Sequence, residues 1–294
     1  MPKLRRSQLA TPANKYHMIK KSAESRADQV FLDLEDSVPP GERADARENI
    51  EKAMKELDWG EKTVSVRINP VDKECWLEDV TSVAGSGIDT IILPKVSSEK
   101  DVYAVEKVLD TIQDADEIGL EPQIEDGEAL HNVMEIAGAS ERNQSLIFGP
   151  GDYSASTGIP GLSIGASVEY DGHRWHHALA EINAAAKAHN LDCIDGPFAD
   201  VDDLEGYRRS ARNARGIGCD GKWVIHPSQI PVANEVFAPD QETVEEARKV
   251  LERYREASED GKGAIQVDGK LVDEATIKMA ENIVDKNREI EEMR

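Results

Sequence analysis

Acidic side chains follow two short apolar runs in this 294-residue chain, and their type suits metal chemistry. Glu125 ends one run, and Asp152 follows another with Gly149-Pro150-Gly151 beside it. Two carboxylates at neighbouring strand ends, with glycines that leave room, favour a Mg2+ site that keeps several waters. The alternative is that both carboxylates cap helices.

Arg67 lies near the end of a third apolar run, Thr63 to Ile68. Its planar guanidinium could hold a carboxylate or an oxyanion, but an ion pair with Asp33 or Asp36 would also explain it. Independent surface caps would not need cations and carboxylates so closely opposed, so we expect one site. The polar groups at run ends are Asp33, Glu35, Asp36, Arg67, Asn69, Lys95, Glu125, Asp126, Asp152, Asp195 and His226.

Short β-branched runs alternate with amphipathic stretches, the pattern of βα units around a parallel sheet. We predict strands near 5–10, 29–34, 63–68, 89–93, 118–125, 145–149, 191–195 and 222–226. We predict helices near 14–26, 42–57, 75–84, 100–113, 127–138, 173–189, 201–215 and 229–236. This predicts an α/β (β/α)8 TIM barrel over residues 1–237, with its site at the carboxyl ends of the strands. A doubly wound sheet is the alternative, but no G-x-G-x-x-G follows the first strand.

Residues 238–294 follow as a separate segment that is too short to bury a core of its own. We predict a helix near 240–258, a β-like segment at 264–267 and a last helix near 273–292. This C-terminal helical segment is expected to act as a lid or as an arm that reaches a neighbouring subunit.

Charge restricts the classes of partner. Lys and Arg total 35 against 58 Asp and Glu, a net charge of −23, so nucleic acid and anionic membranes would be repelled. No run of 18 apolar residues predicts a membrane span, and we expect a cytoplasmic protein. The even spread of acids suits a salt-rich, halophilic cytoplasm. Three distant cysteines indicate neither a disulfide framework nor a thiolate zinc site.

Ordered motifs along nearly the whole chain resemble the citrate-lyase-beta-like (HpcH/HpaI) aldolases. The shared segments are Asp33-Leu-Glu-Asp-Ser37, Ser65-Val-Arg-Ile-Asn69, Leu93-Pro-Lys-Val96, Ile124-Glu125, Gly151-Asp152, Ile194-Asp-Gly-Pro-Phe198 and Gly221-Lys-Trp-Val-Ile-His-Pro227. Within that family, further segments resemble the L-malyl-CoA/β-methylmalyl-CoA lyases. These are Leu57-Asp-Trp-Gly60, Ala233-Asn-Glu-Val-Phe237 and Gly269-Lys-Leu-Val-Asp-Glu274.

The resemblance implies a Mg2+-dependent enzyme, with Mn2+ as a possible substitute. Its reaction would be the reversible carbon–carbon cleavage of (S)-malyl-CoA to glyoxylate and acetyl-CoA, or of β-methylmalyl-CoA to glyoxylate and propionyl-CoA. It implies Glu125 and Asp152 as metal ligands and Arg67 as the substrate-binding arginine. It also implies Asp273 as a catalytic aspartate lent to a neighbouring subunit of a homo-oligomer, a trimer or hexamer with shared active sites. Implied contacts with substrate or CoA lie at Ala10, Lys15, Lys21, Gly151, Asp152, Ile225 and His226.

Some alternatives stay open. A malyl-CoA thioesterase would need the same metal and substrate contacts, and a citrate lyase beta-type subunit would act on citryl- or citramalyl-CoA. Asp273 would equally serve as the N-cap of the last helix. The chain departs from the family at Thr11-Pro-Ala-Asn14, where a glycine-containing turn is usual, and at Asp126, where a small hydroxyl residue is usual.

Overall fold

The computed structural model describes residues 3–160, 174–259, 265–267 and 270–292. The chain divides into two compact units, Met1–Phe237 and Ala238–Arg294, which are described separately. Among the described helices, none is both long enough and apolar enough to cross a membrane.

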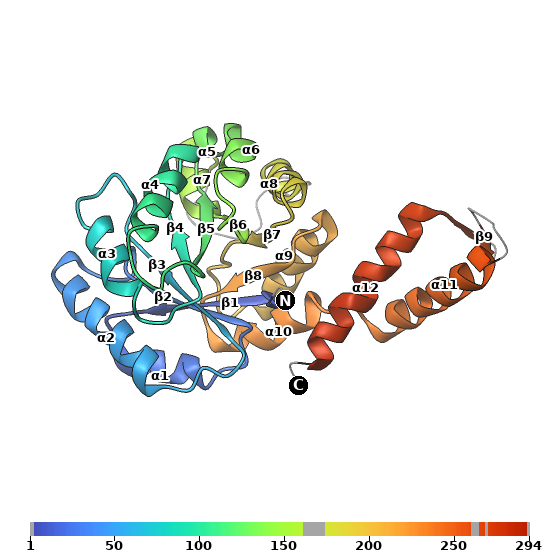
Figure 1. The fold of residues 1–294 in the computed structure, drawn as a ribbon, viewed down its shortest axis with the longest axis horizontal. Coiled ribbons are helices and arrows are strands. Elements are labelled where there is room, and N and C mark those ends of the chain that lie inside the picture. Colours follow the sequence, from blue (N-terminus) through green and yellow to red (C-terminus); the bar gives the residue numbers. More distant parts are fainter. Residues whose placement is uncertain (1–2, 161–173, 260–264, 268–269, 293–294) are drawn as a thin grey trace. The chain divides into compact units, whose positions relative to one another are not determined.

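Eight parallel strands form a closed barrel in the first unit, which confirms the predicted (β/α)8 fold (Figure 1). They pair in chain order, and β8 closes the barrel against β1. Their β-branched runs are buried on both faces, as parallel strands covered by helices require. The strands are β1 (Ser7–Pro12), β2 (Gln29–Asp33), β3 (Thr63–Arg67), β4 (Thr90–Leu93), β5 (Gly119–Ile124), β6 (Ser145–Phe148), β7 (Asp192–Asp195) and β8 (Gly221–Val224).

Helices cover the outside of the barrel (Figure 1). They are α1 (Tyr16–Ala23), α2 (Arg43–Glu56), α3 (Trp76–Val83), α4 (Glu99–Leu109), α5 (Gly127–His131), α6 (Val133–Ala137), α7 (Pro150–Thr157), α8 (His176–Ala188), α9 (Leu204–Ile217) and α10 (Ile230–Val236). Two 3-10 turns, η1 (Pro40–Glu42) and η2 (Pro227–Gln229), precede α2 and α10. Position 173, the predicted start of the helix at 173–189, lies outside the described residues.

Two local predictions were wrong. The helix expected over 127–138 is two short helices, α5 and α6, which meet at Asn132. No helix was predicted directly after β6, but Pro150–Thr157 form α7, so Asp152 lies in the first turn of a helix and not at a strand end. Proline is compatible with the first helical position, and Gly158 ends α7 with a left-handed φ of 70°.

Alternate residues of each strand point into the barrel and form layers across it. The middle layer is apolar and consists of Phe31, Ile92, Ile147, Ile194 and Trp223, with Ala10 packed against it. Phe31 of this layer pairs in register with Ser65 of β3. Two residues further along these strands, at their carboxyl ends, Asp33 pairs with Arg67. A larger apolar core lies around the barrel and includes side chains of both strands and helices.

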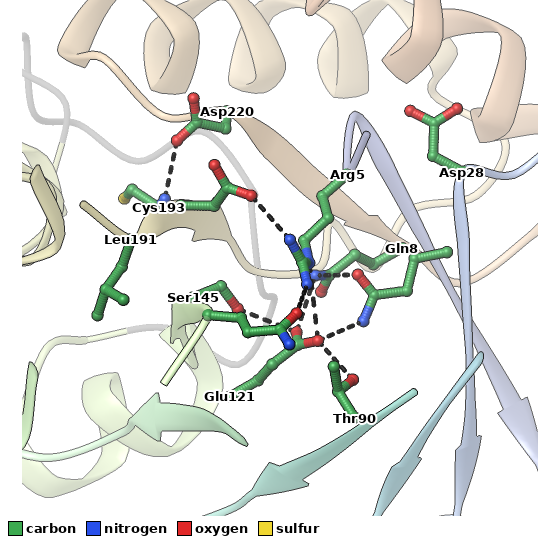
Figure 2. Close-up of polar contacts among 12 residues, drawn as sticks. Arg5, Gln8, Asp28, Thr90, Glu121, Ser145, Leu191, Cys193 and Asp220 are labelled. Atoms are coloured by element: carbon green, nitrogen blue, oxygen red, sulfur yellow. Dashed lines mark hydrogen bonds and ion pairs between the residues drawn. The ribbon is translucent and has the colours of Figure 1, made fainter. Parts of the chain in front are cut away.

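A polar layer fills the amino end of the barrel, where Figure 2 shows Arg5 beside Glu121. The fully buried Glu121 carboxylate accepts hydrogen bonds from Thr90 Oγ1 (2.6 Å), Ser145 Oγ (2.9 Å) and the amides of Gln29 and Gln8. Arg5 Nε lies 3.7 Å from Glu121 Oε1. Because barrel chemistry occurs at the opposite end, this layer contributes to stability.

The second unit is a pair of helices with a short hairpin between them. It contains α11 (Gln241–Glu259), the antiparallel strands β9 (Ile265–Val267) and β10 (Lys270–Val272), and α12 (Glu274–Glu292). An apolar groove of about 220 Å³ is lined by residues of α11, α12 and β10, including Val250, Leu271 and Met279. Leu271 and Met279 are 71% and 65% exposed.

Candidate functional site

Arg67 lies at the carboxyl end of β3, buried against the ends of the neighbouring strands. Its Nε and Nη2 atoms donate to the two carboxylate oxygens of Asp33, at 2.7 and 2.8 Å. The guanidinium also lies over the rings of Phe31 and Trp223, 5.9 and 5.4 Å from their centres. Burial alone would raise the pKa of Asp33, but the Arg67 charge together with the hydrogen bonds from Arg67, Ser37 and the Glu35 backbone outweighs it, and the pKa is lowered. The ion pair that the sequence left as an alternative is therefore present, and it fixes the orientation of Arg67.

Glu35 connects Arg67 to Lys95, the residue that follows β4 by two positions. Glu35 Oε2 lies 2.9 Å from Arg67 Nη1, and Lys95 Nζ donates to Glu35 Oε1 at 2.7 Å. Burial raises the pKa of the Glu35 carboxyl despite both cations. Asp36 lies at the exposed edge of this cluster, 3.7 Å from each cation.

Glu125 follows β5 directly and is 5% exposed. Its Oε2 accepts the backbone N–H of Lys95 at 2.8 Å, and its Oε1 accepts from the Gln123 amide at 3.0 Å. Burial raises the pKa of Glu125 to about 8, and the charges of Glu35 and Asp152 act in the same direction against Arg67. Among the described hydrogen bonds, the Glu125 carboxylate accepts none from a backbone N–H in the first turn of a helix, which argues against the capping alternative for this residue.

Asp152 is an exposed residue in the first turn of α7, where its charge acts on both Glu125 and Lys95. Gly149 leaves room for the Glu125 side chain beside the start of α7, because a Cβ atom at position 149 would lie 2.3 Å from Glu125 Oε1. Asp126 has a different role from its neighbour: it caps α5, and its Oδ1 accepts the Ala129 N–H at 2.7 Å.

The cluster carries more negative than positive charge. Five carboxylates (Asp33, Glu35, Asp36, Glu125 and Asp152) surround two cations, Arg67 and Lys95. A pocket of about 630 Å³ opens beside it, and its lining includes Lys73, Lys95, Glu125, Asp126 and Asp152. Buried Glu125 and exposed Asp152 are hard oxygen donors facing the same pocket. A divalent cation would offset the excess charge and suit both donors.

No cluster of three or more His, Cys, Asp or Glu side chains forms a complete metal site within the described ranges. Glu125 and Asp152 would therefore supply two ligands, and water or substrate oxygens would supply the others, as is usual for Mg2+.

The predicted contacts from the first βα unit lie at its strand and helix. Ala10 is half-buried in β1 beside the apolar layer, and Lys15 precedes α1 with its Nζ 3.4 Å from Glu42 Oε2. Lys21 is exposed in the last turn of α1 next to Lys20.

Two further predicted contacts follow β8. Ile225 is 38% exposed, and its N–H donates to Gln229 Oε1 at 2.9 Å. His226 caps η2, because its Nδ1 accepts the backbone N–H of Ser228 at 3.3 Å, and the same nitrogen lies 2.7 Å from Ser228 Oγ. Asp195 does not join the cluster, because its carboxylate pairs with the buried ammonium of Lys222.

Asp273 belongs to the second unit and precedes α12. Its Oδ1 accepts the backbone N–H of Thr276 at 3.0 Å and the Thr276 hydroxyl at 2.9 Å. The bond from the Thr276 backbone lowers the pKa of the Asp273 carboxyl. The capping role that the sequence allowed is thus present, and both bonds use the same oxygen.

Sequence reasoning did not assign a role to Glu35, Lys95 or Gln123. Glu35 and Lys95 were visible as charged residues at run ends, but their contacts depend on the barrel closing. Gln123 carried no signal beyond its position two residues before Glu125, on the same face of the strand.

Comparisons with known proteins agree on one family. The HpcH/HpaI aldolase/citrate lyase family matches residues 6–227. An L-malyl-CoA/beta-methylmalyl-CoA lyase of Cereibacter sphaeroides is 42% identical over 95% of this chain and 93% of its own length. A (3S)-malyl-CoA thioesterase of the same species is 34% identical over 91% of this chain and 89% of its own. The crystal structure of CitE from Mycobacterium tuberculosis with magnesium, acetoacetate and coenzyme A superposes with a TM-score of 0.77. It is 28% identical and covers 96% of this chain and 97% of its own.

Proposed function

Since this chain belongs to the HpcH/HpaI aldolase/citrate lyase family, we propose that it is a Mg2+-dependent carbon–carbon lyase. It reversibly cleaves (S)-malyl-CoA to glyoxylate and acetyl-CoA, β-methylmalyl-CoA to glyoxylate and propionyl-CoA, or both. Support comes from the near full-length similarity to a lyase of this name and to a structure that holds magnesium and coenzyme A. The observation that carries the proposal is the cluster in which five carboxyl groups, Glu125 and Asp152 among them, lie around only two cations.

Glu125 and Asp152 would hold the metal. Mg2+ held there would polarise the aldehyde of glyoxylate and offset the charge of its carboxylate. The buried setting of Glu125 strengthens its attraction to a cation, because little solvent screens the interaction.

Arg67 binds the thioester oxygen and holds it as charge develops there. Its contacts with Asp33 and Glu35 engage at most three of its five N–H groups, so donors remain for substrate. Asp33 keeps the guanidinium in one orientation, and a preorganised donor stabilises an enolate oxygen better than a mobile one.

Asp273 acts as the base that removes a proton from the carbon next to the thioester, and it returns the proton in the cleavage direction. Two hydrogen bonds from Thr276, both to Oδ1, hold this carboxylate at the start of α12. We propose that Asp273 serves the site of a neighbouring subunit in a homo-oligomer, a trimer or hexamer. Inactive Asp273→Ala and Arg67→Ala subunits should then regain part of the activity when mixed and reassembled, and mixtures as inactive as their parents would refute the sharing.

Lys15 and Lys21 contact the phosphates of CoA, and Lys20 adds to the positive charge there. The alkylammonium groups of Lys20 and Lys52 lie 5.1 and 4.7 Å from the ring centre of Tyr16. A local basic surface is needed because the chain as a whole carries a charge of −23. Ala10, Gly151, Ile225 and His226 complete the proposed contacts with substrate.

Hydrolysis is the second candidate, because a (3S)-malyl-CoA thioesterase is also similar over most of the chain. An assay with malyl-CoA that measures glyoxylate and free CoA separately distinguishes the two. Glyoxylate with no free CoA supports the lyase, whereas free CoA with no glyoxylate refutes it. An assay with citramalyl-CoA that measures pyruvate and free CoA separately tests the citrate lyase-type alternative.

A further inference from the structure

The cluster contains more carboxylates than the proposed metal needs. Glu125 and Asp152 are the proposed ligands, yet Glu35 is buried within the same charge field and its charge acts directly on Glu125. A carboxylate that can reach a metal will compete for it with water and with substrate oxygens. The structure must therefore hold Glu35 elsewhere.

Glu35 is held by a cation on each of its two oxygens. Arg67 Nη1 lies 2.9 Å from Oε2, and Lys95 Nζ lies 2.7 Å from Oε1. With the Lys95 ammonium removed, Oε1 would be a buried oxygen without its cation, which is costly unless another positive group replaces it.

Lys95 is also bonded to the proposed metal ligand through its backbone. Its N–H donates to Glu125 Oε2 at 2.8 Å, while its side chain reaches Glu35. The residue has a left-handed φ of 51°, a conformation that is strained for a lysine and that glycine adopts freely. One strained residue thus separates the two glutamates: it orients one toward the pocket and ties the other to its side chain.

We propose that Lys95 is a positioning residue that keeps Glu35 off the metal, so that a coordination position remains for glyoxylate. The inference rests on the proposed metal site but not on the identity of the thioester. Lys95 determines which carboxylates become ligands: Glu125, which its backbone orients, is one, and Glu35, which its side chain binds, is not.

Lys95→Met tests this proposal, because methionine keeps the Cβ and the chain length but lacks the charge. Direct titration with Mn2+, followed by electron paramagnetic resonance, should show about 10-fold tighter binding than in the wild type. Water-proton relaxation should show that bound Mn2+ has lost about one exchangeable water. In the condensation direction, KM for glyoxylate should rise and kcat/KM should fall about 10- to 100-fold. Lys95→Gln removes the same charge and should give the same shifts.

Suppression by a second substitution makes the test specific. Glu35→Gln in the Lys95→Met background removes the competing carboxylate, so the water count and KM for glyoxylate should return toward wild-type values. Lys95→Arg should stay close to the wild type. Lys107→Met is the matched control. Lys107 lies in α4, is similarly exposed, and pairs at 2.7 Å with the carboxylate of Asp110, the residue that follows α4.

The proposal is overturned if Lys95→Met leaves Mn2+ affinity and the water count unchanged, or if the double variant is no better than the single. Neither Mn2+ measurement requires turnover. If the wild type does not cleave malyl-CoA but Lys95→Met and Lys95→Gln show these Mn2+ shifts relative to it, the proposed reaction is refuted and the role of Lys95 is retained.

Discussion

Gly149 is the residue at which a single methyl group should disable the metal site. Its φ of −103° is open to any residue, so alanine adds no backbone strain. The added Cβ would lie 2.3 Å from Glu125 Oε1 and 2.5 Å from its Cγ. Ordinary contact begins near 3.5 Å, so Glu125 must move by roughly 1 Å.

A displacement of that size exceeds what metal coordination tolerates, since ligand distances hold to about 0.2 Å. We expect Gly149→Ala to weaken Mn2+ binding by about 10- to 100-fold, and to lower kcat/KM by a similar factor. Overpacking should cost about 1–3 kcal/mol of unfolding free energy, partly offset by the loss of glycine entropy in the unfolded chain.

Gly127→Ala is the matched control, because Gly127 begins α5 near the same pocket and its added Cβ would lie 3.8 Å from Thr157 Cγ2. It should keep the wild-type Mn2+ affinity and melt at the same or a higher temperature. Isothermal titration with Mn2+ and thermal melts of both variants make the comparison. Equal Mn2+ affinity in Gly149→Ala and Gly127→Ala would refute the reasoning.

Four further outcomes follow from the same structure. Burial raises the pKa of Glu125 to about 8, so Mn2+ binding at pH 7 should release close to one proton, and Mn2+ affinity should fall as the pH drops below 8. Calorimetric titrations in buffers of different ionisation enthalpy measure the number of protons released, and a value of zero would contradict this prediction. The same raised pKa stabilises the metal-free protein at low pH, and this contribution should be lost as the pH rises through 8. Glu121→Ala should lower the unfolding free energy by about 3–5 kcal/mol, because it removes the buried carboxylate that pairs with Arg5 and accepts four hydrogen bonds, with Mn2+ affinity of the folded protein unchanged. The excess of acids predicts that the melting temperature falls on dilution from molar to about 0.01 M salt, where the Debye length grows to about 30 Å, and a flat series would refute the halophilic interpretation.

The barrel could be predicted because its signals are local. β-branched runs and amphipathic stretches alternate along residues 1–237, and each strand was placed within a few residues. The helix α7 was missed because proline and glycine in Gly149-Pro150-Gly151 also suit an extended turn. Its capping glycine, Gly158, was the available signal for a helix end.

The candidate site could be predicted only as a set of charged strand ends. Position along the chain indicated that Arg67 and Glu125 share a rim, but not that Asp33 would take two of the guanidinium donors. The division of carboxylates between cations and an open pocket depends on side-chain directions and on the φ of Lys95. Asp195 shows the converse, since its pairing with Lys222 removes it from the cluster that its position suggested.

The most direct test of the account is the rate of glyoxylate release from malyl-CoA by chelator-treated protein before and after Mg2+ is restored. Glu125→Gln and Asp152→Asn are measured beside the wild type, and circular dichroism checks that each is folded. We predict that only the wild type recovers full activity at moderate Mg2+, and that both variants bind the metal more weakly. Full activity of the treated wild type without metal, or of either variant after the same treatment, would contradict the proposed metal site.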